Sequence, residues 1–466
     1  MRTFRSLHHA NYRLYFTGAL VSNVGTWMSR VAQDWLVLTV LTDNSAVSLG
    51  IVTALQFLPM LLLAPYGGVL ADQFSKRRLL ACTQTAMAVL GLLLGVLTAT
   101  GTVELWHVYV IATVFGMATA VDNPARQAFV SEMVPDEDIP NAVGLNSASF
   151  NFARLLGPGT AGILIAGVGI PPAFFLNTIS FAAVLVALWR MDPATLRHSR
   201  RAARGSGALR DGLRYVRTKP DIMLILVIVF FFGTFCMNSQ LTNALMATQV
   251  FHKGAGEYGL LGTIMAVGSL SAALLAARRK VPSRKVLIGS LVGFGFSSIA
   301  AGLAPNYTVF AILLIPFGLF ALSMMTTANA IVQLAADPPM RGRVMALYMA
   351  VFMGGTPVGA PMIGWIGDTM GARATILAGA GVSLLVAAWA TMSLMRTHQI
   401  PLSELHRRVL WWPRADAPAS TGDEPPFTPA RTATVPVGTR PAAPATAEPY
   451  PAQEAPVSPG RPAQRR

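Results

Sequence analysis

Apolar residues along this chain gather into long runs separated by short polar segments. Stretches of about 17 to 25 apolar residues, the length that crosses a bilayer as a helix, occur twelve times. They cover residues 14–40, 46–71, 79–100, 105–127, 141–167, 172–190, 221–249, 257–277, 286–304, 307–333, 343–367 and 372–396. The pattern predicts an all-α integral membrane protein with twelve transmembrane helices.

Composition supports a membrane protein and indicates which partners it contacts. The 466 residues are 53% hydrophobic and 12% charged, and a soluble protein of that composition would expose a large apolar surface. The formal net charge is +15, but the bases punctuate the apolar runs instead of gathering on one soluble domain. That distribution predicts contact with a lipid bilayer and argues against nucleic-acid binding.

Lysine and arginine are distributed unequally between the two sets of connecting loops. Bases cluster after the even-numbered runs, as in Lys76-Arg77-Arg78, whereas the loops of the other set offer only Lys253 and Arg373. Because cytoplasmic loops are enriched in bases, both termini are expected in the cytoplasm and the protein in the plasma membrane.

The longest internal polar stretch divides the twelve runs into six and six, as a duplicated unit would. Gly157 and Gly162 recur 202 residues later as Gly359 and Gly364, although glycine is common in membrane helices. We expect two pseudo-symmetric six-helix bundles joined by a cytoplasmic linker with a short amphipathic helix, and a disordered Pro/Ala-rich tail. The corresponding ranges are 1–191, 192–220, 221–396 and 397–466.

The segment GGVLADQFSKRR lies between the second and third runs and sets one acid and three bases at a turn. Twelve runs in two sixes with this segment in that place resemble the major facilitator superfamily. Gly68, Asp72 and Arg77 match the family's loop signature. Gln73 and Ser75 depart from it, because the family usually has Arg and Gly there.

The resemblance implies that this loop latches the two bundles together on the cytoplasmic side. Asp72 is expected to cap the eleventh helix near Gly342, because a carboxylate favours a helix amino terminus. Lys76 or Arg77 is expected to pair with Asp122. The expected cytoplasmic gate comprises Gly68, Asp72, Lys76, Arg77 and Arg126. Ordinary positive-inside charge remains the alternative for the bases, and the loop between the eighth and ninth runs keeps bases without an acid, so the latch is expected on one side.

The fifth run contains ARLLGPGTAG, from Ala153 to Gly162. Gly157, Pro158 and Gly162 resemble the antiporter motif of drug exporters, a glycine-rich segment that gives a bent, closely packed helix face. A structural kink without directional meaning is the alternative. The strings DNPARQAF, RVAQDWLVL and ALQFLP are similar to the branch that contains the enterobactin exporter and macrolide efflux proteins.

Four residues of the first run fall on a single helix face: Asn23, Trp27, Arg30 and Asp34. Charged groups in a bilayer need partners or water, so this face is expected to line a cavity, with Arg154 of the fifth run close by. A proton-driven carrier needs a group that gains and loses a proton, and acids inside the runs are scarce. Asp34 is the first candidate for proton coupling and Asp122 the second; a static ion pair between Arg30 and Asp34 is the alternative.

The second half offers further cavity candidates. Polar residues of the seventh run, from Thr234 to Gln249, are read as one helical stripe, with phenylalanine beside it, and the tenth run adds flexible methionine. The candidates are Phe235, Asn238, Thr242, Met324 and Asn329. Packing between helices is an equally good explanation for any one of them. Two arginines against one aspartate suggest an anionic or catechol-like substrate, such as a siderophore.

These features predict a secondary active transporter, in which protons drive export of a small molecule, a siderophore, antibiotic or drug-like compound, by alternating access. The P-loop and HExxH patterns do not occur, so no enzymatic activity, cofactor or metal is expected, and a monomer suffices. Uptake by proton symport is one alternative. A membrane sensor that signals through its C-terminal tail is the other.

Overall fold

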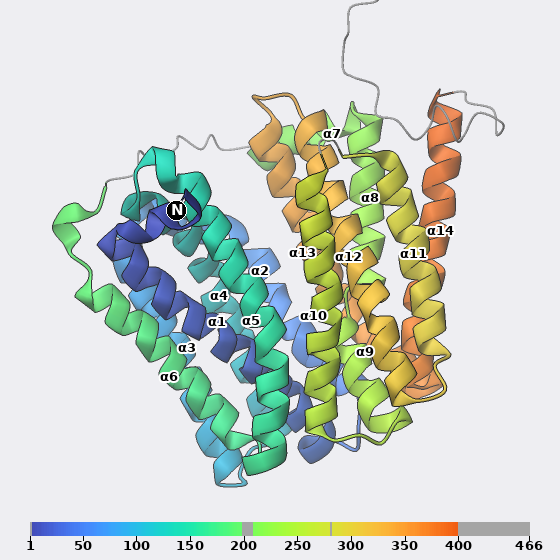
Figure 1. The fold of residues 1–466 in the computed structure, drawn as a ribbon, viewed down its shortest axis with the longest axis horizontal. Helices are drawn as coiled ribbons and strands as arrows, with labels where there is room; N and C mark the ends of the chain where they lie inside the picture. Colours follow the sequence, from blue (N-terminus) through green and yellow to red (C-terminus); the bar gives the residue numbers. More distant parts are fainter. Residues whose placement is uncertain (1, 198–207, 280–281, 399–466) are drawn as a thin grey trace, which may run out of the picture. The chain divides into compact units, whose positions relative to one another are not determined.

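The computed structural model describes residues 2–197, 208–279 and 282–398, and these residues are helical almost throughout (Figure 1). The long helices are α1 (Ala10–Leu36), α2 (Ala46–Gln73), α3 (Lys76–Ala99), α4 (Leu105–Met133), α5 (Ile139–Val168), α6 (Pro171–Arg190), α8 (Pro220–Phe235), α10 (Ala255–Arg278), α11 (Arg284–Gly302), α12 (Tyr307–Ala335), α13 (Arg341–Met370) and α14 (Ala372–His398). The short ones are α7 (Ala208–Arg217), α9 (Ser239–Leu245), η1 (Arg2–His8), η2 (Val37–Leu41), η3 (Asp136–Asp138), η4 (Pro193–Thr195) and η5 (Met246–Val250).

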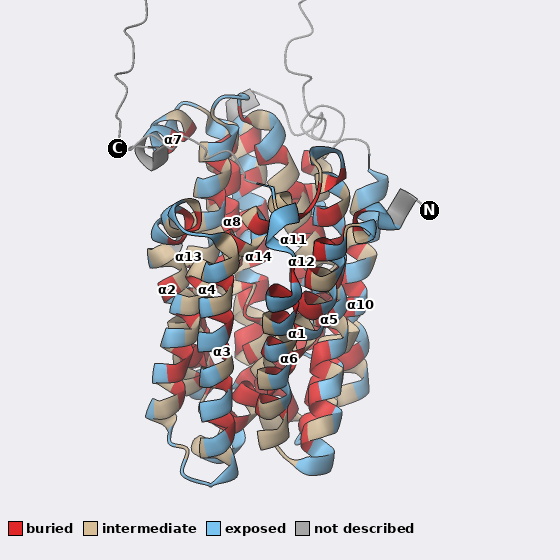
Figure 2. Ribbon diagram, turned by 90° about the vertical axis from the view of Figure 1, so that its left-hand side faces the viewer, coloured by how far each residue is buried: buried red, intermediate tan, exposed pale blue. Residues whose placement is uncertain are grey.

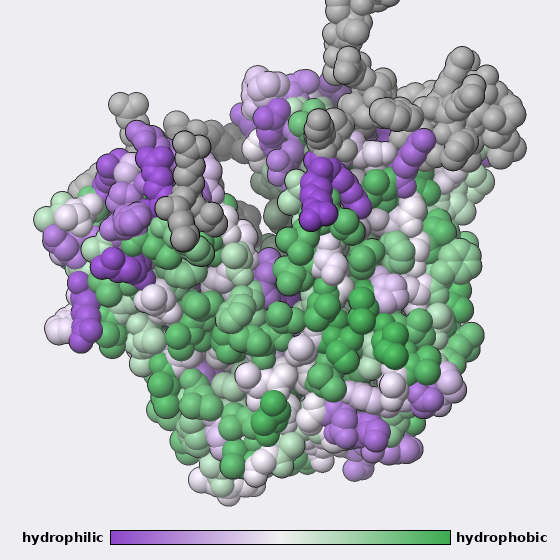
Figure 3. All heavy atoms as spheres, in the orientation of Figure 1, coloured by the Kyte–Doolittle hydropathy of each residue, from purple (hydrophilic) through white to green (hydrophobic). Residues whose placement is uncertain are grey.

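The surface has the polarity of a membrane protein. Hydrophobic residues gather around the middle of the molecule in Figure 3, with hydrophilic residues toward both ends. Figure 2 shows that the outward sides of the long helices are exposed or intermediate, and many of these side chains are large and apolar, such as Ile163 and Leu385. Apolar surface of this extent is stable in lipid and not in water.

Ten helical segments in the described residues are long and apolar enough to span a membrane. The other two long helices, α1 and α5, have 27 and 30 residues, but they carry buried polar side chains such as Asp34 and Ser149. The twelve predicted spans therefore correspond to twelve helical segments, of which ten meet a test of length and hydropathy alone.

The first six long helices pack on one another, as α1 does on α5 and α6 and α2 on α4. The later ones do the same, as α10 does on α12 and α11 on α14. Two helix pairs make most of the contacts between the first half and the second: α2 with α13, and α5 with α10. The boundaries of the four predicted segments remain a prediction, and most of the tail 397–466 lies outside the described residues.

Pseudo-symmetry between the halves is visible in the backbone. The bounds of α5 and α13 differ by 202 residues at both ends, and the glycine that follows each helix, Gly169 or Gly371, has φ of 88°. Each half also opens with a long segment that ends in a π-helix, η2 in the first and η5 in the second. The local glycine repeat therefore reflects a repeated structure.

The seventh predicted helix is not continuous. It ends as α8 at Phe235 and resumes as α9 at Ser239, and Asn238 between them has φ −94° and ψ 29°. The prediction of one helical stripe from Thr234 to Gln249 was therefore wrong. The break leaves backbone groups outside a helical hydrogen-bond ladder, which within a membrane protein is tolerated where the chain lines a cavity.

The linker contains the predicted short helix, α7, which packs on α8 and α13. Val216 of this helix is buried. Asp211 pairs with Arg343 at 3.2 Å, and the Tyr215 hydroxyl accepts a hydrogen bond from the Asp337 amide at 3.0 Å. Helix α7 is thus attached to the second half through both apolar and polar contacts.

Candidate functional site

A cavity of about 450 Å³ lies between the two halves of the molecule. Helices α1, α2 and α5 line it from the first half, and the broken α8–α9 segment, α10, α12 and α13 line it from the second. Its surface is mainly apolar and includes four methionines: Met237, Met265, Met325 and Met353. Unbranched thioether side chains adapt to ligands of varied shape, so the lining suits a bulky, partly apolar molecule.

Three of the four residues on the predicted α1 face line this cavity: Trp27, Arg30 and Asp34. The fourth does not, because the Asn23 carboxamide donates to the Ser149 hydroxyl of α5 at 3.2 Å. Its position one turn before Trp27 puts Asn23 in the contact between α1 and α5. Asn23 is therefore a packing residue in this structure.

Two arginines meet at the Trp27 ring. The guanidinium carbon of Arg30 lies 5.2 Å from the ring centroid of Trp27 and 5.8 Å from that of Phe57, and the Arg154 carbon lies 6.0 Å from the Trp27 centroid. Cation–π contacts of this kind hold a cation without cancelling its charge. Within the described ranges, neither arginine forms an ion pair with a carboxylate within 4.0 Å.

Asp34 is bound from the other half of the molecule. The Tyr258 hydroxyl of α10 donates to the Asp34 carboxylate at 3.0 Å, and the Tyr258 ring stacks on Trp35 with centroids 5.9 Å apart. The side chain of Asp34 is turned toward α10, whereas Arg30 lies over the aromatic rings. The ion pair between Arg30 and Asp34, which was the alternative to proton coupling at Asp34, is therefore not formed between these two described residues.

Sequence reasoning missed Tyr258, which follows Glu257 at the start of an apolar run. It also missed the adjoining Gln56 and Gln240, both of which line the cavity. An isolated tyrosine in a membrane helix is an available signal, because its hydroxyl needs a partner when buried. Which partner it finds depends on how the halves pack.

Of the candidates from the seventh predicted helix, one lines the cavity and two do not. Asn238 lines the cavity at the break before α9, and its carboxamide donates to the Thr234 carbonyl at 2.7 Å. Thr242 is buried in α9, where its hydroxyl donates to the Ser239 carbonyl at 3.2 Å, and Phe235 packs against the apolar core. Neither Thr242 nor Phe235 is among the residues that line the cavity.

In α12 the candidate Met324 does not line the cavity. Met324 is fully buried among core side chains, and its neighbour Met325 lines the cavity instead. Asn329 lies further along α12, where its carboxamide oxygen accepts from Gln333 at 2.8 Å. An apolar helix gives little sequence signal for which side faces a cavity, because the lipid-facing side is apolar as well.

The second acid, Asp122, lies in a closed network within the first half. One carboxylate oxygen accepts from Thr83 and Gln84, both at 2.8 Å, and the other accepts from Arg126 at 2.9 Å. Asp122 is 2% exposed and does not line the cavity. This geometry is that of a buried structural ion pair in which both carboxylate oxygens accept hydrogen bonds.

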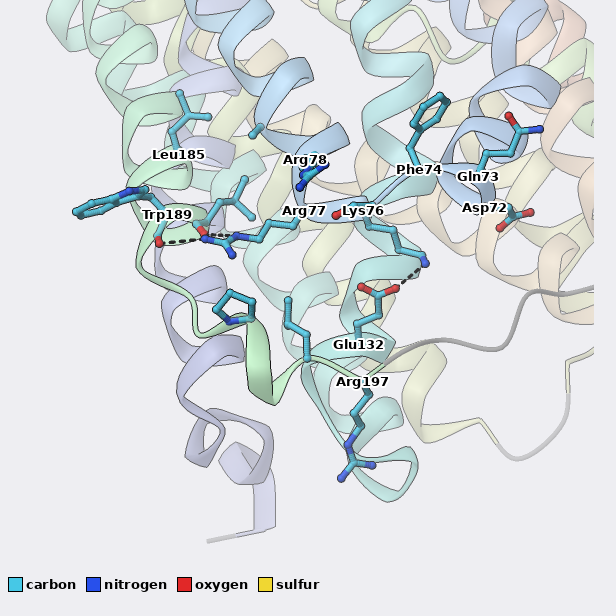
Figure 4. A pocket seen from close by; sticks show the side chains of 15 residues that line it. Asp72, Gln73, Phe74, Lys76, Arg77, Arg78, Glu132, Leu185, Trp189 and Arg197 are labelled. Atoms are coloured by element: carbon cyan, nitrogen blue, oxygen red, sulfur yellow. Dashed lines mark hydrogen bonds and ion pairs between the residues drawn. The ribbon is translucent and has the colours of Figure 1, made fainter. Parts of the chain in front are cut away.

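The loop between α2 and α3 borders a surface pocket of about 790 Å³ (Figure 4). Lys76 pairs with Glu132 at 2.6 Å, and Arg77 donates to the carbonyls of Leu188 and Trp189 at 2.7 and 3.1 Å. The predicted pairing of Lys76 or Arg77 with Asp122 was therefore wrong. Asp122 is buried deeper and is occupied by Arg126, while Glu132 and the end of α6 lie nearer these bases.

The rest of the predicted gate lies along the same end of α2. Gly68 is buried, and neighbouring Gly67 faces the Ala120 carbonyl of α4 so closely that a Cβ would clash. Asp72 lies one residue before the end of α2 and borders the pocket. In Figure 4 its side chain lies apart from Arg77 and Glu132. Its role as a latch remains a prediction.

The antiporter-like motif lies where α5 meets α10. A Cβ on Gly157 would clash with Trp27 of α1, and one on Gly162 would come within 2.7 Å of the Ala255 carbonyl. Gly259 of α10 faces the Pro158 carbonyl as closely, and the Thr263 hydroxyl donates to the Leu155 carbonyl at 2.9 Å. The motif thus forms a close contact between the halves, beside the cavity.

Comparisons with known proteins agree with this architecture. A family model described as a transmembrane secretion effector, a branch of the major facilitator superfamily, matches residues 1–413. The staphyloferrin A transporter of Staphylococcus aureus (strain NCTC 8325 / PS 47) is 27% identical over 383 residues, 77% of this chain and 90% of that protein. The multidrug efflux pump Tap of Mycobacterium tuberculosis (strain ATCC 25618 / H37Rv) is 26% identical over 392 residues, with shares of 78% and 89%.

Solved structures agree as well. A bacterial homologue of the human lysosomal transporter Spinster, in an inward-facing and unoccupied conformation, has a TM-score of 0.65 at 13% identity. The similarity covers 87% of this chain and 99% of that one. At this identity the likeness concerns the fold. The predicted all-α membrane fold and the predicted resemblance to efflux proteins are confirmed.

Proposed function

Because this chain belongs to the transmembrane secretion effector family of the major facilitator superfamily, we propose that it exports a small molecule in exchange for protons. It is a multi-pass membrane transporter related to efflux pumps, not an enzyme. The two halves alternate between closing one end of the cavity and closing the other. The proposal places both termini in the cytoplasm of a plasma-membrane protein that acts as a monomer.

The observation that carries the proposal is the Asp34–Tyr258 hydrogen bond inside the cavity. It joins α1 to α10, so it links the two halves at the site where a substrate would bind. An ionised carboxylate accepts this bond strongly, and a protonated one accepts it less well. Taking up a proton at Asp34 would therefore loosen the contact between the halves, which couples protonation to the conformational change.

Asp122 is the weaker candidate for this role. Its carboxylate accepts hydrogen bonds from Thr83, Gln84 and Arg126, and none of these partners belongs to the second half. We assign Asp122 and Arg126 to the stability of the first half.

The charge and shape of the cavity favour an amphiphilic substrate with an anionic or phenolic group. Arg30 and Arg154 offer guanidinium groups that carry no carboxylate partner in the described ranges. Aromatic rings and four methionines supply apolar contact. Siderophores and amphiphilic antibiotics combine these properties. Relatives named as a staphyloferrin A transporter and as a multidrug efflux pump are consistent with this range.

The test is transport in inside-out membrane vesicles with an imposed proton gradient, using ethidium, erythromycin and 2,3-dihydroxybenzoate as probes. Proton-driven accumulation of at least one probe is expected for the wild type. The Asp34→Asn variant should lose the dependence on the gradient, whereas Asp43→Asn, which changes an exposed acid, should keep it. Full proton coupling in Asp34→Asn contradicts the assigned role.

The same vesicles separate the alternatives. Proton-driven loss of the probe from the vesicles identifies uptake by symport. Deletion of residues 413–466, which lie outside the described ranges, should leave an exporter most of its activity. A sensor that signals through this tail would instead lose its response while showing no transport.

A further inference from the structure

Helix α2 begins under a carboxylate that comes from the other half of the molecule. Asp368, two residues before the end of α13, accepts hydrogen bonds from the Ala46 amide at 2.6 Å, the Val47 amide at 3.1 Å and the Ser45 hydroxyl at 3.1 Å. We infer that Asp368 is a positioning residue for transport, a latch that holds the halves together at this end and must release α2 before the cavity opens there.

The contacts account for the first turn of α2. The first amides of a helix have no partner within the helix. Ser45, the N-cap, accepts from the Ser48 amide at 3.2 Å, and Asp368 takes the two amides between them. A carboxylate is also favoured by the partial positive charge of a helix N-terminus. Separating the halves at this end would remove the partner of both amides together.

Helices α5 and α10 form the contact that is pseudo-symmetric to that of α13 and α2, and they pack closely without an acid at the position of Asp368. Gly162 of α5 faces the Ala255 carbonyl at the start of α10 just as Gly364 of α13 faces the Ala46 carbonyl at the start of α2. The residue of α5 that corresponds to Asp368 is Ala166. Helix α10 instead caps itself, because the Gly254 amide donates to Glu257 at 3.1 Å.

Helix α2 has Ser45 as its N-cap but no acid of its own in the first turn, because Ser48 occupies the position that Glu257 has in α10. The carboxylate at the start of α10 thus comes from its own half, and the carboxylate at the start of α2 comes from across the interface. Only the second contact depends on whether the halves are together. This asymmetry assigns Asp368 a part in the conformational change rather than in helix stability alone.

Two further contacts close the same end. Gly50 of α2 faces the Ala360 carbonyl of α13 so closely that a Cβ would clash. The Gln249 carboxamide of the second half donates to the Asn44 carbonyl of the first at 2.8 Å. The backbones of α2 and α13 are therefore in direct contact here, and Asp368 lies at the end of that contact.

Asp368 lies outside the two loops that were compared when a latch on one side was expected. That expectation came from the loop between the eighth and ninth runs, which has no acid. In the structure α2 and α13 run antiparallel, and each has an acid within two residues of its last residue, Asp72 or Asp368. The second acid lies at the far end of α13, where the loop comparison did not look.

The test measures which end of the cavity is open. Met353, which lines the cavity, is replaced by Cys in a background without Cys82 and Cys236. Labelling by a membrane-impermeant maleimide is followed in whole cells and in inside-out vesicles, so that each end is probed in turn. The variants are Asp368→Ala, Asp368→Asn, the double variant Asp368→Ala/Ser48→Glu, and Asp43→Asn as the control acid at the same end.

Loss of the latch should raise labelling from the Asp368 end about tenfold or more, the effect of one charge-assisted hydrogen bond on an equilibrium, and lower it from the opposite end. Ser48→Glu places a carboxylate in the first turn of α2, where a helix N-terminus favours negative charge. The double variant therefore stabilises this helix end from within the first half, without the latch, and should label like Asp368→Ala. Asp43→Asn should label like the parent. If Asp368→Ala does not fold, Asp368→Asn gives the same comparison.

Labelling of the double variant at the parent rate would show that Asp368 only caps a helix, and unchanged labelling in both Asp368 variants would also overturn the inference. The inference rests on the proposed alternation of the two halves. Labelling needs neither a substrate nor a proton gradient. The labelling rates therefore still report which end of the cavity is open if the proposed proton-coupled export proves wrong.

Discussion

The hydrogen bond between Tyr258 and Asp34 makes a quantitative prediction for Tyr258→Phe. The substitution removes one hydroxyl oxygen and keeps the ring, so the stacking on Trp35 at 5.9 Å persists. A hydrogen bond to a charged group contributes about 1.5–3 kcal/mol net. Because this bond joins α1 to α10, its loss should favour conformations with the halves apart at this site by roughly tenfold to a hundredfold.

The assay is the rate at which a hydrophobic carbodiimide modifies Asp34, followed by mass spectrometry in membranes. Tyr258→Phe should raise that rate and uncouple a comparable share of proton-driven transport. The matched control is Tyr307→Phe, because the Tyr307 hydroxyl donates to the Glu257 carbonyl within the second half at 2.9 Å. Equal modification rates in the wild type and both variants would refute the reasoning that this bond links the halves.

Three further predictions concern other contacts. Gly259→Leu should destabilise the protein by at least about 1–3 kcal/mol, because a Cβ there meets the Pro158 carbonyl; thermal unfolding in detergent checks this against Gly289→Leu, whose Cβ would have no neighbour within 4 Å. Asp122→Ala should cost about 3–5 kcal/mol by leaving Arg126 buried without its partner, whereas Asp43→Ala should be neutral in the same measurement. Arg154→Met should weaken binding of an anionic probe about tenfold and leave a neutral probe unaffected, as titration of the purified protein would show; equal losses for both probes would contradict the assigned charge recognition.

The sequence predicted well wherever membrane physics leaves one solution. Exposing the charged face of α1 to lipid would cost several kcal/mol. The sequence therefore placed Trp27, Arg30 and Asp34 at a cavity. The duplicated glycines of α5 and α13 were readable for a similar reason, because close helix contacts require small residues. The number of helical segments followed from the length of the runs.

The errors arose where the outcome depends on tertiary packing. The break between Phe235 and Ser239 contains neither proline nor glycine, so no local signal marks it. The partner of Asp34 proved to be 224 residues away in the sequence, and spacing along α1 favoured Arg30 instead. The choice between Met324 and Met325 turns on a rotation of α12 that an apolar sequence does not define.

The two halves share a backbone plan but not their chemistry, and this difference bears on how the transporter works. If the side chains were as symmetric as α5 and α13, closing either end of the cavity would involve equivalent contacts. The cavity's charged groups, Arg30, Asp34 and Arg154, all come from the first half, and the cap on α2 comes from the second. In this structure the bonds that cross between the halves include Asp368 on α2, Gln249 on Asn44 and Tyr258 on Asp34. A substrate or proton that opens the Asp368 end has to offset these bonds, and of the two carboxylates that take part in them Asp34 is the one that lines the cavity.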